Sequence, residues 1–262
     1  MSTALISLGS NLGDRRLRLD AALSQLATTS GVRLLRRSRC RASVPVGGPP
    51  GQDAFLNGAA LLETSLGPQA LLAILHDIEQ RAERRRAERW ASRTLDLDLL
   101  LHGETIVEDD QLTLPHPRMT SRRFVLNPAR EIAGALLHPT SGWTVAALAR
   151  QLDVGRRVVV AADDDAQQSK LIAALAERCS HSMRPVGPPA VEPWQPPSPA
   201  RWWPAETLLM LAVCPSRCTS ERNARQQLKL PAFGPVTWLG ACEGMTLIDE
   251  AAAAVQAASS PA

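Results

Sequence analysis

The 262-residue sequence predicts an α+β fold: a ferredoxin-like β-α-β-β-α-β core with additional helices, followed by a small C-terminal appendix of α/β type. Three observations lead to this prediction. Strand-like and helical hydrophobic patterns alternate in that order from residue 4 to residue 107. Eight prolines fall within the twenty-one residues 184–204, which predicts an extended linker. Beyond that linker, two apolar runs are each followed by a helical pattern.

Hydrophobic spacing defines the core elements. The apolar run 4–8 predicts a strand, and leucines at 17, 19, 23 and 26 predict a helix over 15–27 that Asp14 caps. Pro68 opens a long amphipathic helix that we expect to continue to about residue 88. The other elements expected in this part are strands over 32–43 and 55–64, a Gly/Pro loop over 45–51, the strand that begins at Asp96, a turn at 103–104, a short strand near 105–107, and helices over 124–135 and 145–152.

The C-terminal part has a different texture. We expect a helix over 161–178, since three aspartates at its start suit the positive end of a helix dipole. The remaining elements expected there are strands over 207–213 and 235–239 and helices over 220–228 and 247–257. The predicted organisation is a catalytic domain over 1–160, a helix and Pro-rich linker over 161–204, and an appendix of unknown function over 205–262.

Composition excludes several classes of protein. The 29 basic residues are nearly matched by 26 acidic ones, so charge gives no reason to expect nucleic acid as a partner. No apolar run reaches transmembrane length and no signal-peptide pattern opens the chain, so we expect no membrane association. Five irregularly placed cysteines do not form a disulfide framework, and the expected compartment is the reducing cytoplasm.

Asp96 and Asp98 are the most informative pair of residues. On a strand they project from the same face, where two carboxylates repel each other unless a cation lies between them. Oxygen ligands suit Mg²⁺, which often completes its shell with substrate phosphates. An exposed edge strand with both aspartates in water is the alternative. The arginines that precede the pair favour phosphoryl transfer; they are Arg85, Arg86, Arg89 and Arg93.

Several further motifs occur in one order along the chain. They are Leu8-Gly9-Ser10-Asn11-Leu12-Gly13, Pro45-Val46-Gly47, Phe55-Leu56-Asn57, Ile78-Glu79, Arg89-Trp90, Arg93-Thr94-Leu95-Asp96-Leu97-Asp98, Leu114-Pro115-His116-Pro117-Arg118-Met119, Arg122 and Phe124-Val125-Leu126. Over roughly residues 3–153 the chain resembles the 6-hydroxymethyl-7,8-dihydropterin pyrophosphokinase family of folate biosynthesis. The Arg-Thr-Leu-Asp-Leu-Asp and Pro-His-Pro-Arg-Met motifs are the most specific part of this resemblance.

The resemblance implies an activity and a set of site residues. The activity is transfer of pyrophosphate from ATP to the pterin alcohol, which releases AMP, with two Mg²⁺ ions expected at Asp96 and Asp98. The implied catalytic residues are Arg93, Asp96, Asp98, His116 and Arg122. The implied ATP-binding residues are Arg85, Arg86, Trp90, Arg93, Leu99, Thr113, His116 and Arg122. The implied pterin-binding residues are Ser43, Val44, Val46, Phe55, Asn57 and Phe124, with the two phenylalanines stacking on the ring. Plain core packing is the alternative for both phenylalanines.

The chain departs from the family pattern at a few positions. Ser43 stands where many members have Thr, and Arg41 replaces a nearby tyrosine. The loop 81–86 is shorter than in some relatives, which leaves the individual roles of Arg84, Arg85 and Arg86 open. His76 replaces a familiar Gln, and we expect it to be a helix-surface histidine and not a metal ligand.

Two other functions stay open at this point. A non-catalytic ferredoxin-like binding module would leave the aspartate pair unexplained. A bifunctional or regulatory folate or nucleotide protein with a degenerate C-terminal domain would explain the appendix, but the tail has no P-loop. Cys214 and Cys218 have no histidine nearby, which disfavours zinc. Protein partners and oligomeric state are not predicted.

Overall fold

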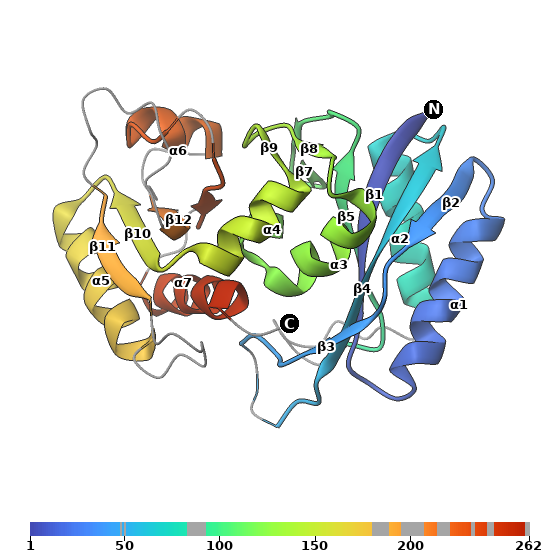
Figure 1. The fold of residues 1–262 in the computed structure, drawn as a ribbon, viewed down its shortest axis with the longest axis horizontal. Coiled ribbons are helices and arrows are strands. Elements are labelled where there is room, and N and C mark those ends of the chain that lie inside the picture. The colour runs from blue at the N-terminus through green and yellow to red at the C-terminus, as the bar shows by residue number, and fades with distance from the viewer. Residues whose placement is uncertain are drawn as a thin grey trace. The chain divides into compact units, whose positions relative to one another are not determined.

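The computed structural model describes residues 1–47, 49, 51–82, 93–179, 189–194, 207–213, 221–231, 234–239 and 244–259. Contacts within the chain divide it into two compact units (Figure 1). The first unit comprises Met1–Met119 and Phe124–Pro139, and the second comprises Thr120–Arg123 and Thr140–Pro261.

The first unit has the predicted ferredoxin-like core. Its elements are β1 (Ser2–Ser10), α1 (Arg15–Thr28), β2 (Val32–Arg37), β3 (Arg41–Ser43), β4 (Phe55–Thr64), α2 (Pro68–Arg81) and β5 (Asp96–His102). The sheet order is β2-β4-β1-β5 with every pair antiparallel, and β3 also pairs with β4. The β-α-β-β-α-β prediction is confirmed.

Helices α1 and α2 cover one face of this sheet, and the strands alternate accordingly. Ala4, Ile6 and Leu8 of β1 point into a core that both helices complete with leucines and Ile78. Asp14 caps α1 as expected, its carboxylate accepting the Leu17 N–H at 3.0 Å, and Pro68 lies at the first turn of α2. The residues between the core positions face the opposite side of the sheet, which is where the polar motif residues lie.

The second unit is a small parallel α/β arrangement. Its strands are β10 (Arg157–Ala162), β11 (Ala190–Pro193), β12 (Thr207–Val213) and β13 (Thr237–Trp238). They lie in the order β11-β10-β12-β13, with all pairs parallel. Every residue of β12 is buried, as expected for a strand covered on both faces. Gly155 precedes β10, and a Cβ there would lie 2.3 Å from the Leu208 Cα, so no larger residue fits. The elements that follow β5 along the whole chain are β6 (Val107–Glu108), β7 (Thr113–Leu114), a 3₁₀ turn (Met119–Ser121), α3 (Arg123–Ala133), β8 (Leu137–His138), β9 (Trp143–Thr144), α4 (Val145–Val154), β10 (Arg157–Ala162), α5 (Asp165–Cys179), β11 (Ala190–Pro193), β12 (Thr207–Val213), α6 (Glu221–Gln227), β13 (Thr237–Trp238) and α7 (Gly244–Ser259).

The structure differs from the sequence prediction in several places. The helix expected over 161–178 begins only at Asp165, because residues 161 and 162 belong to the strand β10. The strand expected over 32–43 is split into β2 and β3, and α2 ends at Arg81 instead of continuing to about 88. The boundary expected at 160 falls inside β10, because that strand is the centre of the second sheet and pairs with β11 and β12. The Pro-rich stretch expected as a linker contributes β11, an edge strand, where proline removes no ladder hydrogen bond.

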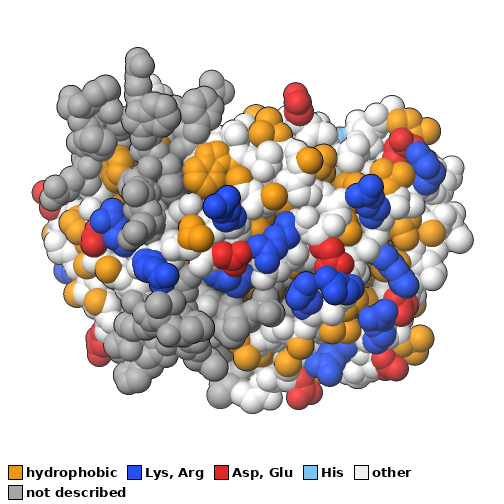
Figure 2. Space-filling view, in the orientation of Figure 1, with side chains coloured by type: hydrophobic (Ala, Val, Ile, Leu, Met, Phe, Trp, Pro, Cys, Tyr) orange, Lys and Arg blue, Asp and Glu red, His pale blue; other side chains and the backbone are white. Residues whose placement is uncertain are grey.

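Arginines gather on the exposed strands β2 and β3 of the first unit, as Figure 2 shows over this part of the molecule. Arg33 pairs with Glu63, while Arg39 and Arg41 pair with Glu131. Three arginines of this region are therefore paired with carboxylates from β4 and α3. Separately, none of the described helices is both long and apolar enough to cross a bilayer.

Candidate active site

The aspartate pair lies on the face of β5 that α1 and α2 do not cover. Along β5 the aspartates are half-buried, whereas Leu97 and Leu99 are buried in the helix-side core. This alternation places Asp96 and Asp98 on one face, as their spacing predicts. The Leu99 side chain is 3% exposed, so the ATP contact predicted for this residue would have to come from its backbone.

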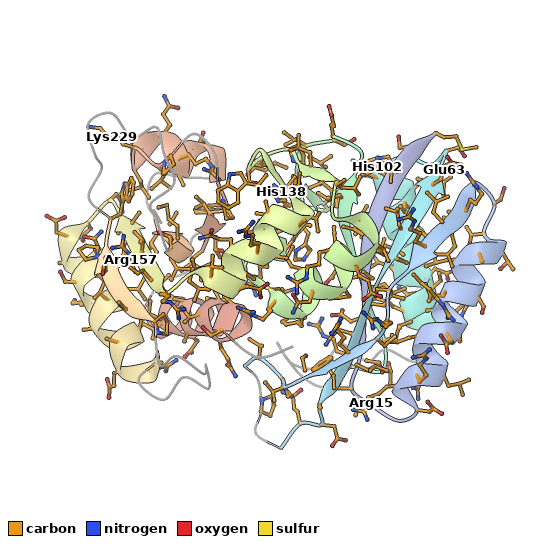
Figure 3. All side chains as sticks on the ribbon, viewed as in Figure 1. Arg15, Glu63, His102, His138, Arg157 and Lys229 are labelled. Carbon is orange, nitrogen blue, oxygen red and sulfur yellow. The ribbon has the colours of Figure 1, made fainter. Side chains whose placement is uncertain are left out.

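Strand register brings the aspartates next to the other motifs. Gly9 of β1 is opposite Asn57 on one side and Asp96 on the other, and Ser7 is opposite Asp98. Side chains directly opposite each other in antiparallel strands share a face. Figure 3 shows Arg15 at the end of the sheet away from Glu63 and His102, and Arg15 Nη1 donates to the Ala54 carbonyl at 2.6 Å next to β4. The row Asn57–Gly9–Asp96 lies toward this same end of the sheet.

Asn57, Phe55 and Asp96 converge above Gly9. A Cβ at Gly9 would lie 3.3 Å from Asn57 Oδ1, 3.8 Å from Asp96 Cβ and 3.9 Å from Phe55 Cδ1. Residues predicted to bind the pterin and a residue predicted to hold a metal thus lie next to the same position of β1. Asn57 is 6% exposed, and its Nδ2 donates to Ser43 Oγ at 2.8 Å, which fixes the orientation of the amide.

Arg93 forms an ion pair with Asp96. Its Nη1 lies 2.5 Å from Asp96 Oδ2. Partial burial works against the charge of Arg93, but Asp96, Asp98 and Glu79 outweigh it, and the pKa of the guanidinium is raised above its ordinary value. Arg93 is therefore a permanent cation beside the aspartate pair.

The Gly-Ser-Asn motif holds the segment that leads into β5. Asn11 accepts the Arg93 N–H at 2.7 Å through Oδ1, and its own N–H donates to the Arg93 carbonyl at 3.0 Å. Ser10 Oγ donates to the Thr94 carbonyl at 2.6 Å. These three bonds explain why this motif accompanies the aspartate motif: it fixes the backbone that carries Arg93.

Glu79 is a site residue whose role the sequence reasoning missed. It lies on α2, is 2% exposed, and its Oε1 accepts the N–H of Leu97 at 2.7 Å. Leu97 is the residue between the two aspartates, so a buried carboxylate anchors the middle of the pair. The signal available in the sequence was a glutamate within the apolar face of the predicted helix, one turn after Leu75.

His116 is tied to β5 by its backbone. Its N–H donates to the Leu100 carbonyl at 2.9 Å, and its Nδ1 accepts the Arg118 N–H at 3.2 Å. With Nδ1 an acceptor, the neutral ring carries its proton on Nε2. Thr113, predicted to contact ATP, is exposed on β7.

The other predicted residues are distributed as follows. Val44 is exposed and Val46 is half-buried in the loop after β3, while Ser43 is opposite Phe55 in the β3–β4 register. Phe124 lies on α3 and is half-buried. Arg122 belongs to the second unit. The predictions for Arg84, Arg85, Arg86, Arg89 and Trp90 lie outside the described residues.

The donor set at this end of the sheet fits magnesium. Within the described ranges, no three or more His, Cys, Asp or Glu side chains gather as a metal site. Two carboxylates on a rigid strand suit an ion that keeps several waters and takes phosphate oxygens as further ligands. A closed structural metal site would need a larger set of protein ligands.

Comparison with known proteins gives the family. Residues 5–134 match the family described as 7,8-dihydro-6-hydroxymethylpterin-pyrophosphokinase. A Haemophilus influenzae protein named 2-amino-4-hydroxy-6-hydroxymethyldihydropteridine pyrophosphokinase is 43% identical over 141 residues, 54% of this chain and 88% of the relative. The chain belongs to this pyrophosphokinase family. The recognition made from the motifs is confirmed, and with it the enzyme class.

Other proteins with the same name are similar to this chain to about the same degree. The Synechocystis relative is 42% identical over 153 residues, 57% of this chain and 76% of the relative. The Methylorubrum extorquens relative is 39% identical over 153 residues, 58% of this chain and 95% of its own length. A solved Plasmodium falciparum HPPK-DHPS in complex with SDX-DHP is similar at a TM-score of 0.44 and 10% identity, covering 68% of this chain and 54% of that chain.

Proposed function

We propose that this pyrophosphokinase acts at the end of the β4-β1-β5 sheet, where Asp96 and Asp98 would hold magnesium. The reaction is transfer of pyrophosphate from ATP to 6-hydroxymethyl-7,8-dihydropterin in folate synthesis. The single observation that supports this location is the convergence of Phe55, Asn57 and Asp96 above Gly9. The side chains proposed to bind the ring and the carboxylate proposed to hold the metal are neighbours there.

The aspartates would hold the metal that the family generally requires, and we expect two ions. Bound there, Mg²⁺ supplies a positive charge that offsets the phosphate oxygens and can activate the alcohol. Asp98 Oδ2 lies 3.5 Å from Ser7 Oγ, at the limit of a hydrogen bond, and Asp96 bonds to Arg93. Glu79, through the Leu97 N–H, keeps both carboxylates in register.

Arg93 and His116 supply the charge and the hydrogen bond on the phosphate side. The guanidinium of Arg93 offers a two-pronged donor to phosphate oxygens and keeps its charge at any physiological pH. His116 offers Nε2–H as a further donor. Arg122, by its family position, adds a second cation, while Thr113 and the backbone of Leu99 would contact ATP.

The pterin would lie over β4. Phe55 offers one stacking face and Phe124 the other, and Asn57 presents Oδ1 to the ring edge because Nδ2 is bonded to Ser43. Backbone groups of Ser43, Val44 and Val46 complete that edge. Bonding Asn57 to Ser43 in advance removes the need to order the amide when the substrate binds.

In the chemical step the hydroxymethyl oxygen forms a bond to the β-phosphorus. The bond from that phosphorus to the oxygen that bridges to the α-phosphate breaks, and AMP leaves with the electron pair of that bond. The proton of the alcohol is released to solvent. Little covalent chemistry falls to the protein, so positioning and charge neutralisation account for most of the acceleration.

The test is to identify the nucleotide that is released. Incubation with ATP, Mg²⁺ and 6-hydroxymethyl-7,8-dihydropterin, followed by chromatography, should show AMP in equal amount to the pterin diphosphate. Omission of the pterin is the control and should abolish AMP. Formation of ADP, or no turnover, would contradict the proposed function.

A further inference from the structure

Gly9 lies in the middle of the row that joins the two halves of the proposed site. Adjacent strands are about 4.8 Å apart, so the backbones of Asn57 and Asp96, one on each side of β1, are about 10 Å apart. Position 9 adds no side chain between them. The side chains nearest to a Cβ built at position 9 are those of Asn57, Asp96 and Phe55, at 3.3 to 3.9 Å, so the methyl group of an alanine would contact all three.

The backbone does not explain a glycine at this position. Among the described residues, the glycines with positive φ do not include Gly9, so its strand conformation is open to any residue. Glycine inside a strand lowers stability relative to alanine, and it often marks a place where a ligand approaches the backbone closely. Gly9 also faces away from the helix-side core, which Leu8 enters.

The three side chains nearest to position 9 have different roles in the proposed site. Phe55 and Asn57 would bind the pterin ring, and Asp96 would hold the metal. In the substrate, the methylene and the oxygen of the hydroxymethyl arm extend from the pterin ring toward the position proposed for the metal. We propose that Gly9 is a specificity-determining residue: because it has no side chain, the hydroxymethyl arm of the pterin can lie against the backbone of β1 at this position. This inference rests on the proposed site.

The experiment compares two ligands on three proteins. The ligands are 6-hydroxymethyl-7,8-dihydropterin and 7,8-dihydropterin, which lacks the arm. Binding is measured by calorimetry with Mg²⁺ and an ATP analogue whose α,β-bridge is methylene, so that no turnover occurs. The proteins are the wild type, Gly9→Ala and the matched control Gly58→Ala. Gly58 pairs with Leu8, and a Cβ there meets Cys40 Sγ at 3.5 Å and Ser38 Oγ at 3.7 Å, which is ordinary contact.

Gly9→Ala should bind the arm-bearing pterin about tenfold to a hundredfold more weakly, as expected for one extra methyl group in a filled site. Because the new Cβ also lies 3.3 Å from Asn57 Oδ1, affinity for 7,8-dihydropterin should fall less than affinity for the arm-bearing pterin. Affinity for the ATP analogue should match the wild type, and Gly58→Ala should match the wild type for all ligands. Equal weakening of both pterins, or no weakening of either, would overturn the inference about Gly9.

Two further measurements keep the result decisive. If Gly9→Ala does not fold, a dihydropterin with a methyl group added to the arm carbon imposes the same crowding on the wild type, and binding as tight as that of the parent would overturn the inference. Absence of AMP from the wild-type protein contradicts the proposed function itself. AMP formation by the wild type, together with unaltered pterin binding by Gly9→Ala, contradicts only the role of Gly9.

Discussion

Asn11 binds Arg93 at both ends of the same residue, accepting its N–H at 2.7 Å and donating to its carbonyl at 3.0 Å. Asn11 is 1% exposed, so neither bond is open to water. Its Nδ2 also donates to the Asp53 carbonyl at 3.3 Å, in the loop just before Phe55. One buried amide therefore connects the phosphate side of the proposed site to the pterin side.

Replacing Asn11 by Ala should weaken both stability and catalysis. The change leaves the Arg93 N–H without its acceptor, which costs about 1–3 kcal/mol of unfolding free energy. Denaturant unfolding measures this loss, and the AMP-forming rate should fall with it because Arg93 loses its anchor. Gln111→Ala, on an exposed turn, is the control and should change neither quantity. An unchanged unfolding free energy for Asn11→Ala would contradict the structural role.

Arg93→Ala should slow the chemical step more than it weakens pterin binding. The charge that Arg93 would balance is concentrated on the phosphates, and a well-placed cation in phosphoryl transfer contributes up to roughly 10³-fold. Single-turnover kinetics and pterin titration separate the two effects, with Arg36→Ala on exposed β2 as control. A loss of pterin affinity alone would contradict the assignment of Arg93 to the phosphate side of the site. Since the pKa of Arg93 is raised, its charge should contribute no pH dependence between pH 5 and 9.

Sequence patterns predicted the elements whose signal is local. The strand over 207–213 was predicted with its bounds, because a run of buried apolar residues is a strong signal for a central strand. The shared face of Asp96 and Asp98 followed from strand geometry alone. The strand β11 was missed, because an edge strand that contains proline looks like a linker until its partner β10 is known.

The relations across the sheet could not be predicted in the same way. Motif order suggested that Gly9, Asn57 and Asp96 belong together, but only register shows that they form one row. Glu79 was overlooked as an anchor, because its acceptor role depends on how α2 packs on β5. Both facts depend on long-range pairing, which hydrophobic periodicity does not encode.

Glu131 should make stability pH-dependent in acid. Burial opposes the charge of Glu131. The hydrogen bonds from Arg39 and the positive charges of Arg39 and Arg41 outweigh burial, so the pKa of Glu131 is lowered. The stabilisation is therefore present above the ordinary glutamate pKa of about 4.3 and lost as pH falls through the lower folded value. Glu131→Gln should cost under about 1 kcal/mol at pH 7, and the difference from wild type should vanish once the pH is below the lowered pKa of Glu131. A difference that grows toward acid would have the wrong sign.

A chain ended at Pro139 should retain AMP formation. The core of the first unit is built from residues of β1 to β7, the region that matches the family. Ending at 152 or 160 would instead cut through α4 or β10. The removed part holds the partners of Arg123, which bonds to the Leu152 and Ala258 carbonyls and to Asp153. Aggregation or loss of activity of the shortened protein would contradict this prediction. If Arg123→Ala in the full chain has the same effect, the C-terminal unit is needed for the active fold.

The most direct test of the account is the rate of AMP formation as a function of Mg²⁺ in Asp96→Asn and Asp98→Asn. Asp20→Asn, which removes an exposed carboxylate from α1, is the matched control. Asp98→Asn should stay folded, since removing one carboxylate relieves repulsion within the pair. Asp96→Asn should also stay folded, because the amide oxygen still accepts a hydrogen bond from Arg93 in place of the ion pair. The rate should fall about 10²-fold to 10³-fold and the Mg²⁺ requirement should rise, because the ion loses an anionic ligand. Rates near wild type for both site variants, with an unchanged Mg²⁺ dependence, would contradict the assignment of the aspartate pair as the metal site.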